Sequence, residues 1–402
     1  MSRSRRACVS CIAPPYLLEK LMASKDAALQ AVAMNTMMST SRLLGERSVR
    51  AMTFAAGAPD TGRRTVYDCR NGQRLASAAL ARTEDGAASA DDSVNRAFDG
   101  FGATRDFYSK VLGRNSIDDR GMRLNGYVHY GHDYQNAFWD GQEMVFGDGD
   151  GTVFVDFTKG LDVIAHELTH GVTEFTAALE YHGQSGALNE SVSDVFGSLV
   201  KQWSLGQSAD DADWLIGADL FTPGIQADAL RSLKAPGTAY NNNLLGKDPQ
   251  PDHLSRYANL PDTQAGDFGG VHINSGIPNK AFYLTAIGIG GYAWEAAGHI
   301  WYETLLASNA KTQFQDFADT TYMKADQLYG AGSAEQQAVA AAWREVGVRI
   351  SGVATGPARR SSATPGHNGD GDSLAALTKQ IAALSNQVKA LAKDVAAVKA
   401  RR

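Results

Sequence analysis

Two histidines four residues apart, His166 and His170, flank a glutamate, Glu167, in the stretch IAHELTH at 164–170. On an α-helix this spacing places both imidazoles on one face, while Glu167 lies about 100° around the axis. Two imidazoles on one face are two of the three protein ligands of a catalytic zinc, and a neighbouring carboxylate that is not a ligand can take a proton from water. The motif predicts a zinc hydrolase if the chain supplies a third ligand.

A second helical pattern, GALNESVSD at 186–194, supplies a candidate for that ligand. Glu190 on this helix would complete a His₂Glu site for one zinc ion. Asp194, one turn further on, would accept the outer N–H of a zinc-bound histidine. The alternative for Glu190 is a solvent-facing charge. Its place near a helix start bounded by Gly and Asn argues against that alternative.

With these residues, the chain resembles the thermolysin family of zinc metallopeptidases. The resemblance runs from about Arg64 to Val348. Several ordered blocks are much more specific than one motif. They are NAFWDGQEMVFGDGDG (136–151), DVIAHELTHGVTE (162–174), GALNESVSD (186–194), ALRS (229–232) and GGVHINSGIPNKAFY (269–283). The resemblance implies a zinc endopeptidase with a strand-rich N-terminal half, a helical C-terminal half and the zinc helix across the floor of the cleft.

The resemblance also implies catalytic roles outside the zinc ligands. Glu167 matches the general base, and His272 matches a histidine that stabilises the oxyanion, with Asp267 as the carboxylate that holds it. Tyr181 matches a second oxyanion donor. Donors aimed at the developing oxyanion are a general means of stabilising a tetrahedral intermediate. Without the resemblance, His272 reads as an ordinary loop histidine.

Substrate-binding positions follow from the same resemblance. Arg231 matches a guanidinium that binds a substrate carbonyl with forked donors, and Asn136 and Ala137 match edge-strand positions that pair with the substrate backbone. Five apolar positions match the pocket for the residue after the cut bond. They are Phe154, Phe157, Val163, Ile216 and Leu230. An apolar pocket favours an apolar side chain, so we expect cleavage before Leu, Phe, Ile, Val or Met.

The chain departs from the family at thermolysin's double calcium site. Only Asp162 and Asp213 match its carboxylates, while Lys201, Leu215 and Ala218 stand at its other acidic positions. Calcium needs roughly six to eight oxygen ligands. We therefore do not predict that calcium is required.

The elements that must position these residues fall into two groups. Strand-like runs alternate with turns up to about Asp156, including EMVFGDGDGTVFVDF at 143–157, with one helical stretch near Asp92–Val111. The GDGDG within that run lacks the spacing of a calcium loop and reads as a tight turn. Helical patterns dominate afterwards. This order predicts an α+β fold with a strand-rich catalytic lobe at 51–160 and a helical lobe, including the zinc helix, at 161–350.

Residues 1–50 read as a separate unit with helices around Tyr16–Met22 and Lys25–Met38. They resemble the short propeptide of the protealysin-like branch of the family, which carries a PPYLL-type segment, here at 14–18. The resemblance implies a propeptide that folds against the catalytic unit in cis and occupies the cleft. We expect self-processing between about Gly45 and Ala56. The alternative for PPYLL is an ordinary turn into a helix.

The C-terminal part has a different composition. Residues 351–373 are rich in Gly, Ser, Pro and Ala and read as a flexible linker. In the predicted helix at 374–400, apolar residues then recur at alternating spacings of three and four. They are Leu374, Leu377, Ile381, Leu384, Val388, Leu391, Val395 and Val398. This heptad seam predicts a coiled coil, and its β-branched a and leucine d positions favour a parallel homodimer through 374–398. The alternative is one amphipathic helix that folds back on the enzyme.

Composition excludes other classes. The net charge of −6 argues against the basic surface that nucleic-acid binding needs. The sequence contains no run of eighteen apolar residues, so no membrane span is predicted. Cys8, Cys11 and Cys69 are too few for a disulfide scaffold, and Cys8 and Cys11 read as unremarkable thiols, with a thiolate near the zinc left open. No secretory signal is evident, so we expect a cytoplasmic protein or export by a non-classical route.

The sequence therefore predicts a zinc-dependent neutral endopeptidase that acts on protein or peptide substrates and is made as a self-processing precursor. The competing class is a catalytically inactive or zymogen-locked binding protein on the same fold, oligomerised by the C-terminal coiled coil. The filled catalytic and ligand positions favour the enzyme. They are Glu167, Tyr181, Glu190, Arg231 and His272.

Overall fold

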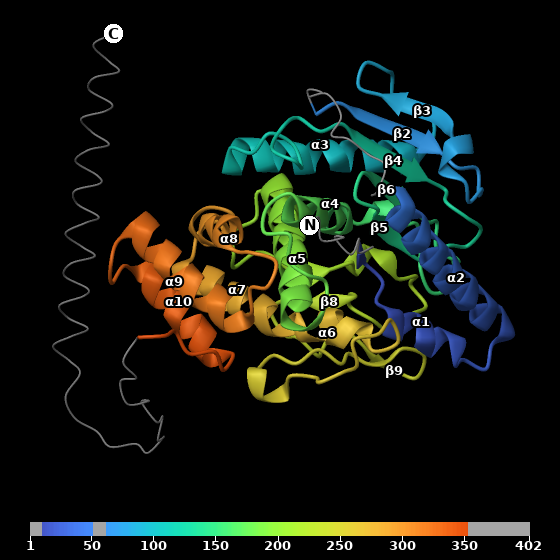
Figure 1. Ribbon diagram of the computed structural model, residues 1–402. Helices are drawn as coiled ribbons and strands as arrows, with labels where there is room; N and C mark the ends of the chain where they lie inside the picture. Colours follow the sequence, from blue (N-terminus) through green and yellow to red (C-terminus); the bar gives the residue numbers. More distant parts are fainter. Residues whose placement is uncertain (1–9, 51–61, 353–402) are drawn as a thin grey trace, which may run out of the picture. The chain divides into compact units, whose positions relative to one another are not determined.

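The computed structural model describes residues 10–50 and 62–352, and these residues belong to one compact unit (Figure 1). Residues 353–373 of the predicted linker, the predicted coiled coil, residues 51–56 of the predicted processing region and Cys8 lie outside the described residues. Within the described ranges, no helix combines the length and the apolar character needed to cross a membrane.

A six-stranded mixed sheet forms the strand-rich part, in the order β1-β5-β6-β4-β2-β3. Its strands are β1 (Ser10–Cys11), β2 (Arg64–Asp68), β3 (Ala79–Thr83), β4 (Leu124–Val128), β5 (Ala137–Trp139) and β6 (Glu143–Phe146). The neighbours β2, β4 and β6 are parallel, whereas β3, β5 and β1 pair antiparallel at the two sides. The N-terminal segment thus supplies the edge strand next to β5.

Two short antiparallel pairs complete the strands. They are β7 (Leu215–Ile216) with β8 (Arg231–Ser232), and β9 (Asn241–Asn242) with β10 (Gly246–Lys247). The first pair matters for the site because it carries Arg231 toward the zinc helix.

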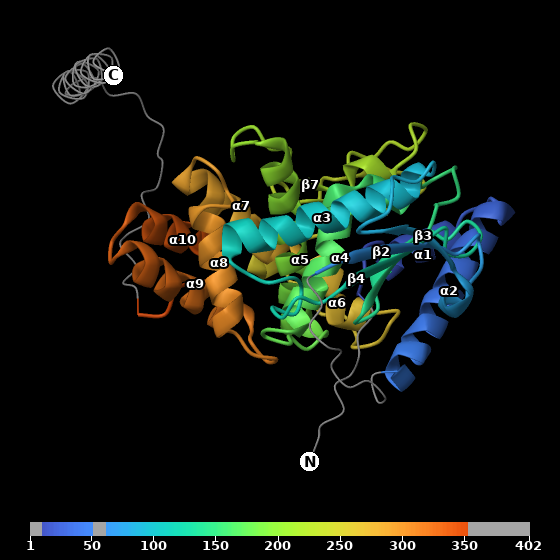
Figure 2. The same cartoon turned by 90° about the horizontal axis from the view of Figure 1, so that it is seen from above.

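The long helix α3 (Asp92–Leu112) has clear start and stop signals. Asp91 accepts hydrogen bonds from the N–H groups of Ser93 and Val94, and Gly113 ends the helix in the left-handed conformation with φ 69°. Seen from above, α3 crosses over α4 and α5 (Figure 2). It covers both the sheet and the zinc helix.

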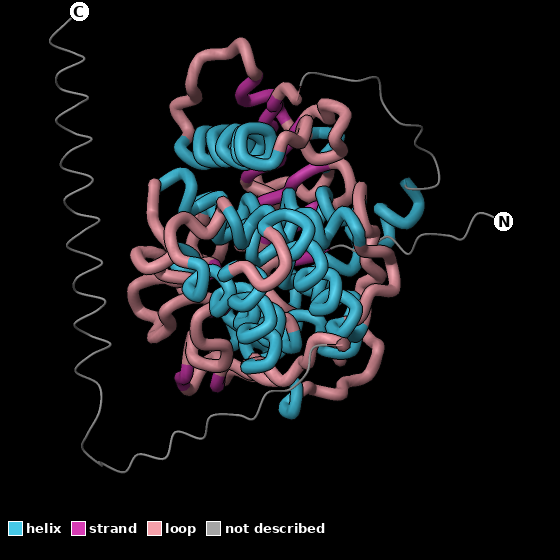
Figure 3. The backbone as a smooth tube through the Cα atoms, turned by 90° about the vertical axis from the view of Figure 1, so that its left-hand side faces the viewer, coloured by secondary structure: helices cyan, strands magenta, loops and turns pink. Residues whose placement is uncertain are grey.

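The helical part packs around α4 and α5. Its helices are α4 (Leu161–Glu174), α5 (Gly183–Leu205), α6 (Asp267–Asn274), α7 (Gly276–Ile289), α8 (Ala296–Ala307), α9 (Phe314–Tyr329) and α10 (Ala334–Glu345). The strands of the large sheet lie toward one end of the unit and helices fill most of the rest (Figure 3). The predicted α+β fold is confirmed.

A close crossing of α4 and α5 sets the geometry of the site. Gly197 of α5 lies against α4, where a Cβ atom would stand 2.6 Å from the backbone oxygen of Asp162 and 3.3 Å from the Cβ of His166. A larger residue would force the helices apart. This contact brings the second helix, with Glu190, up to the histidines of the first.

Two helices of the N-terminal segment, α1 (Pro15–Met22) and α2 (Ala27–Arg50), pack against each other at one side of the unit (Figure 1). The sequence predicted the second of these helices at Lys25–Met38. In the structure, α2 begins two residues later, at Ala27, and continues to Arg50. Asp26 accepts a hydrogen bond from Ala28 N at 2.8 Å and starts it. No proline interrupts the stretch before Arg50, so nothing local ends the helix at Met38.

The second half of the strand-like run at 143–157 is not a strand. Asp150 Oδ1 accepts hydrogen bonds from the N–H groups of Thr152 at 3.1 Å and Val153 at 2.8 Å, which closes a turn. Such side-chain bonds compete with ladder pairing for the backbone donors. Beta-branched composition alone was misleading here.

Candidate active site

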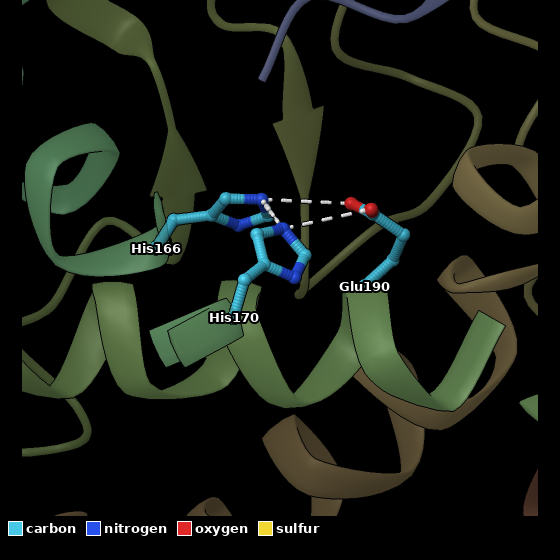
Figure 4. Close-up of side chains that lie close together, drawn as sticks. All are labelled: His166, His170 and Glu190. Carbon is cyan, nitrogen blue, oxygen red and sulfur yellow. Dashed lines mark hydrogen bonds and ion pairs between the residues drawn. The ribbon is translucent and has the colours of Figure 1, made fainter. Parts of the chain in front are cut away.

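Three buried side chains from two helices meet at one point. His166 and His170 on α4 present their Nε2 atoms 3.0 Å apart, and the carboxylate of Glu190 on α5 lies 3.5 Å from the first and 3.6 Å from the second (Figure 4). One ligand atom from each of the three lies within 4.8 Å of the others. This is the predicted set of metal ligands.

The chemistry of this group fits zinc. Burial lowers the pKa of His170 to about 3, so its imidazole is neutral and can act as a ligand. Glu190 Oε2 is buried and has no hydrogen-bond partner among the described residues. Two ring nitrogens and one such carboxylate are the donor set of a catalytic His₂Glu zinc site.

Each histidine is held by a second partner on α5. Asp194 Oδ1 lies 2.8 Å from His166 Nδ1, as expected from the sequence. Asn189 Oδ1 lies 2.8 Å from His170 Nδ1, and Ser193 Oγ lies 3.0 Å from the same nitrogen. The roles of Asn189 and Ser193 were missed, although both stand within three residues of Glu190. Such partners fix the ring orientation and the tautomer of a ligand.

Glu167 lies on α4 below the edge of the sheet. Its Oε2 accepts a hydrogen bond from Trp139 N at 3.0 Å, while Oε1 is buried without a hydrogen-bond partner among the described residues. Burial raises the pKa of Glu167 to about 8. A carboxyl group with a pKa near neutrality can both accept and donate a proton.

The predicted oxyanion residues are brought together around Glu190. Asp267 Oδ1 lies 2.6 Å from His272 Nδ1, and its Oδ2 accepts a hydrogen bond from His272 N at 2.9 Å. The Tyr181 hydroxyl donates to Glu190 and lies 3.3 Å from His272 Nε2. The backbone that aims His272 has positive φ from Asp267 to Gly270, and glycine at two of these four positions limits the strain.

Arg231 is buried and its guanidinium has two partners. Nε and Nη2 form ion pairs with the two oxygens of Asp194 at 2.8 and 2.9 Å. Although burial raises the pKa of Asp194, Arg231 outweighs it and the pKa falls to about 2. The remaining nitrogen, Nη1, donates to the carbonyl oxygen of Ile12 at 3.0 Å.

The N-terminal segment occupies the predicted substrate-pairing positions. Ile12 N donates to Ala137 O at 3.3 Å. Asn136 Oδ1 accepts from Ala13 N at 3.0 Å, and Asn136 Nδ2 donates to Ala13 O at 3.2 Å. The segment therefore extends the sheet as a peptide added to its edge would.

The five apolar positions predicted to line the specificity pocket are all buried, and they share one core cluster with Ile12. They are Phe154, Phe157, Val163, Ile216 and Leu230. The side chain of Ile12 is 0% exposed. Ile12 is therefore an aliphatic residue buried in the same apolar core as these five positions.

At the positions that match the family's calcium site, the ammonium of a lysine lies where a metal ion would be bound. Lys201 Nζ lies 2.8 Å from Asp213 Oδ2 and 3.6 Å from Asp162 Oδ2. Asp162 is buried and also accepts a hydrogen bond from Gly217 N at 3.1 Å. The ammonium balances these carboxylates within the fold.

Cys11 faces the site with its backbone. Its carbonyl oxygen lies 3.1 Å from His272 Nε2, while its side chain belongs to a separate cluster with Tyr134, Phe138 and Leu43 of α2. The thiol is not part of the metal-ligand group.

Comparison with known proteins identifies the family. The family models "Thermolysin metallopeptidase, catalytic domain" and "Thermolysin metallopeptidase, alpha-helical domain" match residues 49–174 and 177–348. An extracellular metalloprotease from Pectobacterium carotovorum subsp. carotovorum is 47% identical over 87% of this chain and 98% of its own. A thermolysin from Alicyclobacillus acidocaldarius subsp. acidocaldarius is 42% identical over 61% of this chain and 44% of its own.

Among solved structures, the precursor of protealysin, a metalloproteinase from Serratia proteamaculans, superposes with a TM-score of 0.76 at 46% identity. The match covers 84% of this chain and 99% of that one. The matched structure is that of a precursor, which agrees with the N-terminal segment described above. On these matches and on the His166, His170 and Glu190 group, the chain belongs to the thermolysin family of metallopeptidases, in its protealysin-like branch.

Proposed function

We propose that the chain is a zinc-dependent neutral endopeptidase, made as a precursor whose own N-terminal segment lies in the substrate cleft. The observation that carries this proposal is the backbone of residues 11–13, which is held by hydrogen bonds between Asn136, Arg231 and His272 beside the metal-ligand group. A peptide substrate would use the same backbone donors and acceptors.

The residues divide the work of hydrolysis. Zinc bound at His166, His170 and Glu190 supplies a Lewis acid that acidifies water and polarises the carbonyl. Glu167 accepts the proton of the attacking water and delivers it to the leaving amine. The oxyanion is stabilised by His272 and Tyr181.

The remaining residues position the peptide. Ala137 and Asn136 hold the backbone of the substrate, and Arg231 holds the carbonyl of the residue after the cut bond. The buried Ile12 supports a pocket for apolar side chains at that residue, so cleavage occurs before large apolar residues. Profiling a peptide library tests this point, and a preference for acidic or basic residues there would contradict it.

Residues 1–50 are a propeptide that acts in cis, ahead of the catalytic lobes at 51–160 and 161–350. The chain processes itself between about Gly45 and Ala56. Because α2 runs to Arg50, the end of this helix must unwind before a bond within it can enter an extended substrate site. Residues 351–373 form a linker, and the heptads at 374–398 pair two copies of the chain.

The decisive experiment is hydrolysis of a fluorogenic peptide with Leu after the cut bond, before and after zinc chelation, by the wild type and by Glu167→Ala. We expect activity only from the zinc-loaded wild type. Activity that survives both the chelator and the substitution would refute the proposal. Inactivity of the processed wild type with zinc bound would instead favour a binding protein, which the filled catalytic positions do not favour.

A further inference from the structure

The peptide bond between Cys11 and Ile12 lies in the cleft in the register of a substrate. Its carbonyl oxygen lies 3.1 Å from Nε2 of His272, and its N–H group donates to Ala137 O at 3.3 Å. The next carbonyl, that of Ile12, accepts from Arg231 Nη1 at 3.0 Å. His272, Ala137 of β5 and Arg231 thus each hold one polar backbone group of Cys11 or Ile12.

The side chains agree with this register. The residue after the bond, Ile12, is aliphatic and completely buried, and it belongs to the same apolar core cluster as the five pocket residues. A cavity between the segment and the catalytic unit is lined by Cys11, Ala13, Tyr181 and His272, among others. The bond therefore borders a space that reaches the oxyanion residues.

Resting on the function proposed above, we propose that Cys11–Ile12 is itself a self-cleavage site, distinct from the processing region at 45–56. Water adds its oxygen to the carbonyl carbon of Cys11 and gives its proton to Glu167. The C–N bond then breaks and this proton passes to the nitrogen of Ile12. The products are a carboxylate on Cys11 and a new amino terminus at Ile12.

This cut does not by itself release the N-terminal segment from the cleft. After it, Asn136 still holds both polar backbone groups of Ala13. Thr36 of α2 accepts from Gln135 N at 3.1 Å, and the hydroxyl of Thr40 lies 2.8 Å from that of Tyr134. The first product is therefore a chain that begins at Ile12 and keeps residues 12–50 in place as a bound product.

The test follows the mass of the full chain. The protein is purified with a zinc chelator, transferred to buffer with zinc, and sampled over time by intact-mass analysis and N-terminal sequencing. We expect a peptide that ends at Cys11 and a chain that begins at Ile12, at a rate independent of protein concentration. Glu167→Ala and Ile12→Asp should not give these products, whereas Ile12→Leu should.

A matched variant and a second readout separate the possible outcomes. Cys11→Ala should still be cut, because only the backbone carbonyl of Cys11 faces His272. In zinc-free Glu167→Ala protein, the amides of Ile12 and Ala13 should exchange hydrogen slowly, and Ile12→Asp should make their exchange at least tenfold faster. Fast exchange without that substitution would show that the segment does not occupy the cleft, and would overturn the inference.

If the zinc-loaded chain cuts a peptide substrate, or processes itself after residue 45, while Cys11–Ile12 stays intact, this inference is wrong and the proposed function stands. If it cuts neither a peptide nor itself, the proposed function fails and the inference fails with it.

Discussion

Asp194 binds Arg231 through both of its oxygens, at 2.8 and 2.9 Å, and the same carboxylate lies 2.8 Å from Nδ1 of the metal-ligating His166. Both Asp194 and Arg231 have side chains with 0% exposure. One carboxylate therefore orients both His166, a proposed zinc ligand, and the guanidinium that holds the carbonyl of Ile12. Zinc binding and the binding of a peptide backbone in the cleft are therefore expected to depend on the same residue, Asp194.

The first prediction concerns this shared support. Asp194→Asn keeps the shape of the side chain but removes its charge, which leaves Arg231 buried without a counter-charge. We expect zinc affinity to fall about 10- to 100-fold and stability to fall by about 3–5 kcal/mol. Competition with a chromogenic chelator and urea unfolding measure the two effects. The control is Asp213→Asn, at a half-exposed carboxylate away from the zinc ligands, which should retain zinc affinity.

The second prediction concerns the oxyanion. In the processed enzyme, His272→Gln should lower kcat by about 10²- to 10³-fold, the usual cost of one oxyanion donor. Zinc content should stay unchanged, because His272 is not a ligand. Steady-state kinetics and atomic absorption on the same sample decide this. An unaltered kcat would assign oxyanion stabilisation to Tyr181 alone.

The third prediction concerns pH and a histidine remote from the zinc. His129 lies between Asp148, 2.8 Å from its Nδ1, and Asp91, 2.8 Å from its Nε2. The hydrogen bond to Asp148, and then Asp91, raises the pKa of His129 to about 9. The folded state holds a proton that the unfolded state loses near pH 6.5, so this stabilisation is complete below about pH 6.5 and is lost as the pH rises through about 9.

His129→Asn is a suitable variant, because asparagine tolerates the positive φ of 53° at this position. Urea unfolding of both proteins between pH 5.5 and pH 9.5 should show a difference on the order of 2 kcal/mol at the acidic end that shrinks toward the alkaline end. A difference that stays constant or grows with pH would contradict the assigned charge state.

The fourth prediction concerns calcium. Because the ammonium of Lys201 lies beside Asp162 and Asp213, adding calcium or a calcium-selective chelator should leave the Tm of the wild type unchanged. Lys201→Met should destabilise the protein by on the order of 2 kcal/mol, since Asp162 stays buried without its cation. Thermal melts of both proteins provide the measurement. A wild-type Tm that rises with calcium would contradict the first part.

The fifth prediction concerns the heptads at 374–398, which lie outside the described residues. Replacing the d residues Leu384 and Leu391 by Glu places charges in the predicted seam and should convert a dimer into a monomer. Light scattering after size-exclusion chromatography measures the mass. The peptidase activity should be retained. A wild-type monomer would instead favour a helix that folds back on the enzyme.

Local regularities explain which elements the sequence could predict. The period of the α-helix fixes the relation of His166 to His170 within five residues, and capping at Asp91 and Gly113 marks the bounds of α3. The run after Phe146 failed as a strand prediction because Asp150 takes the backbone donors that a neighbouring strand would need. The extension of α2 from Met38 to Arg50 was missed, because no proline or other local signal in the sequence marks where this helix ends.

The site shows the same division. The two histidines and Glu167 follow from helical spacing, and Glu190 and Asp194 follow from a second helical pattern and the chemistry of zinc ligands. The oxyanion and substrate-binding candidates followed from the resemblance to a family. Only the tertiary structure decided that Asn189 supports His170, that Asp194 also binds Arg231, and that Arg231 holds the carbonyl of Ile12. Ile12 and Arg231 are 219 residues apart in the chain. Their contact depends on how β1, β5 and β8 pack, and no periodicity within a single element contains that information.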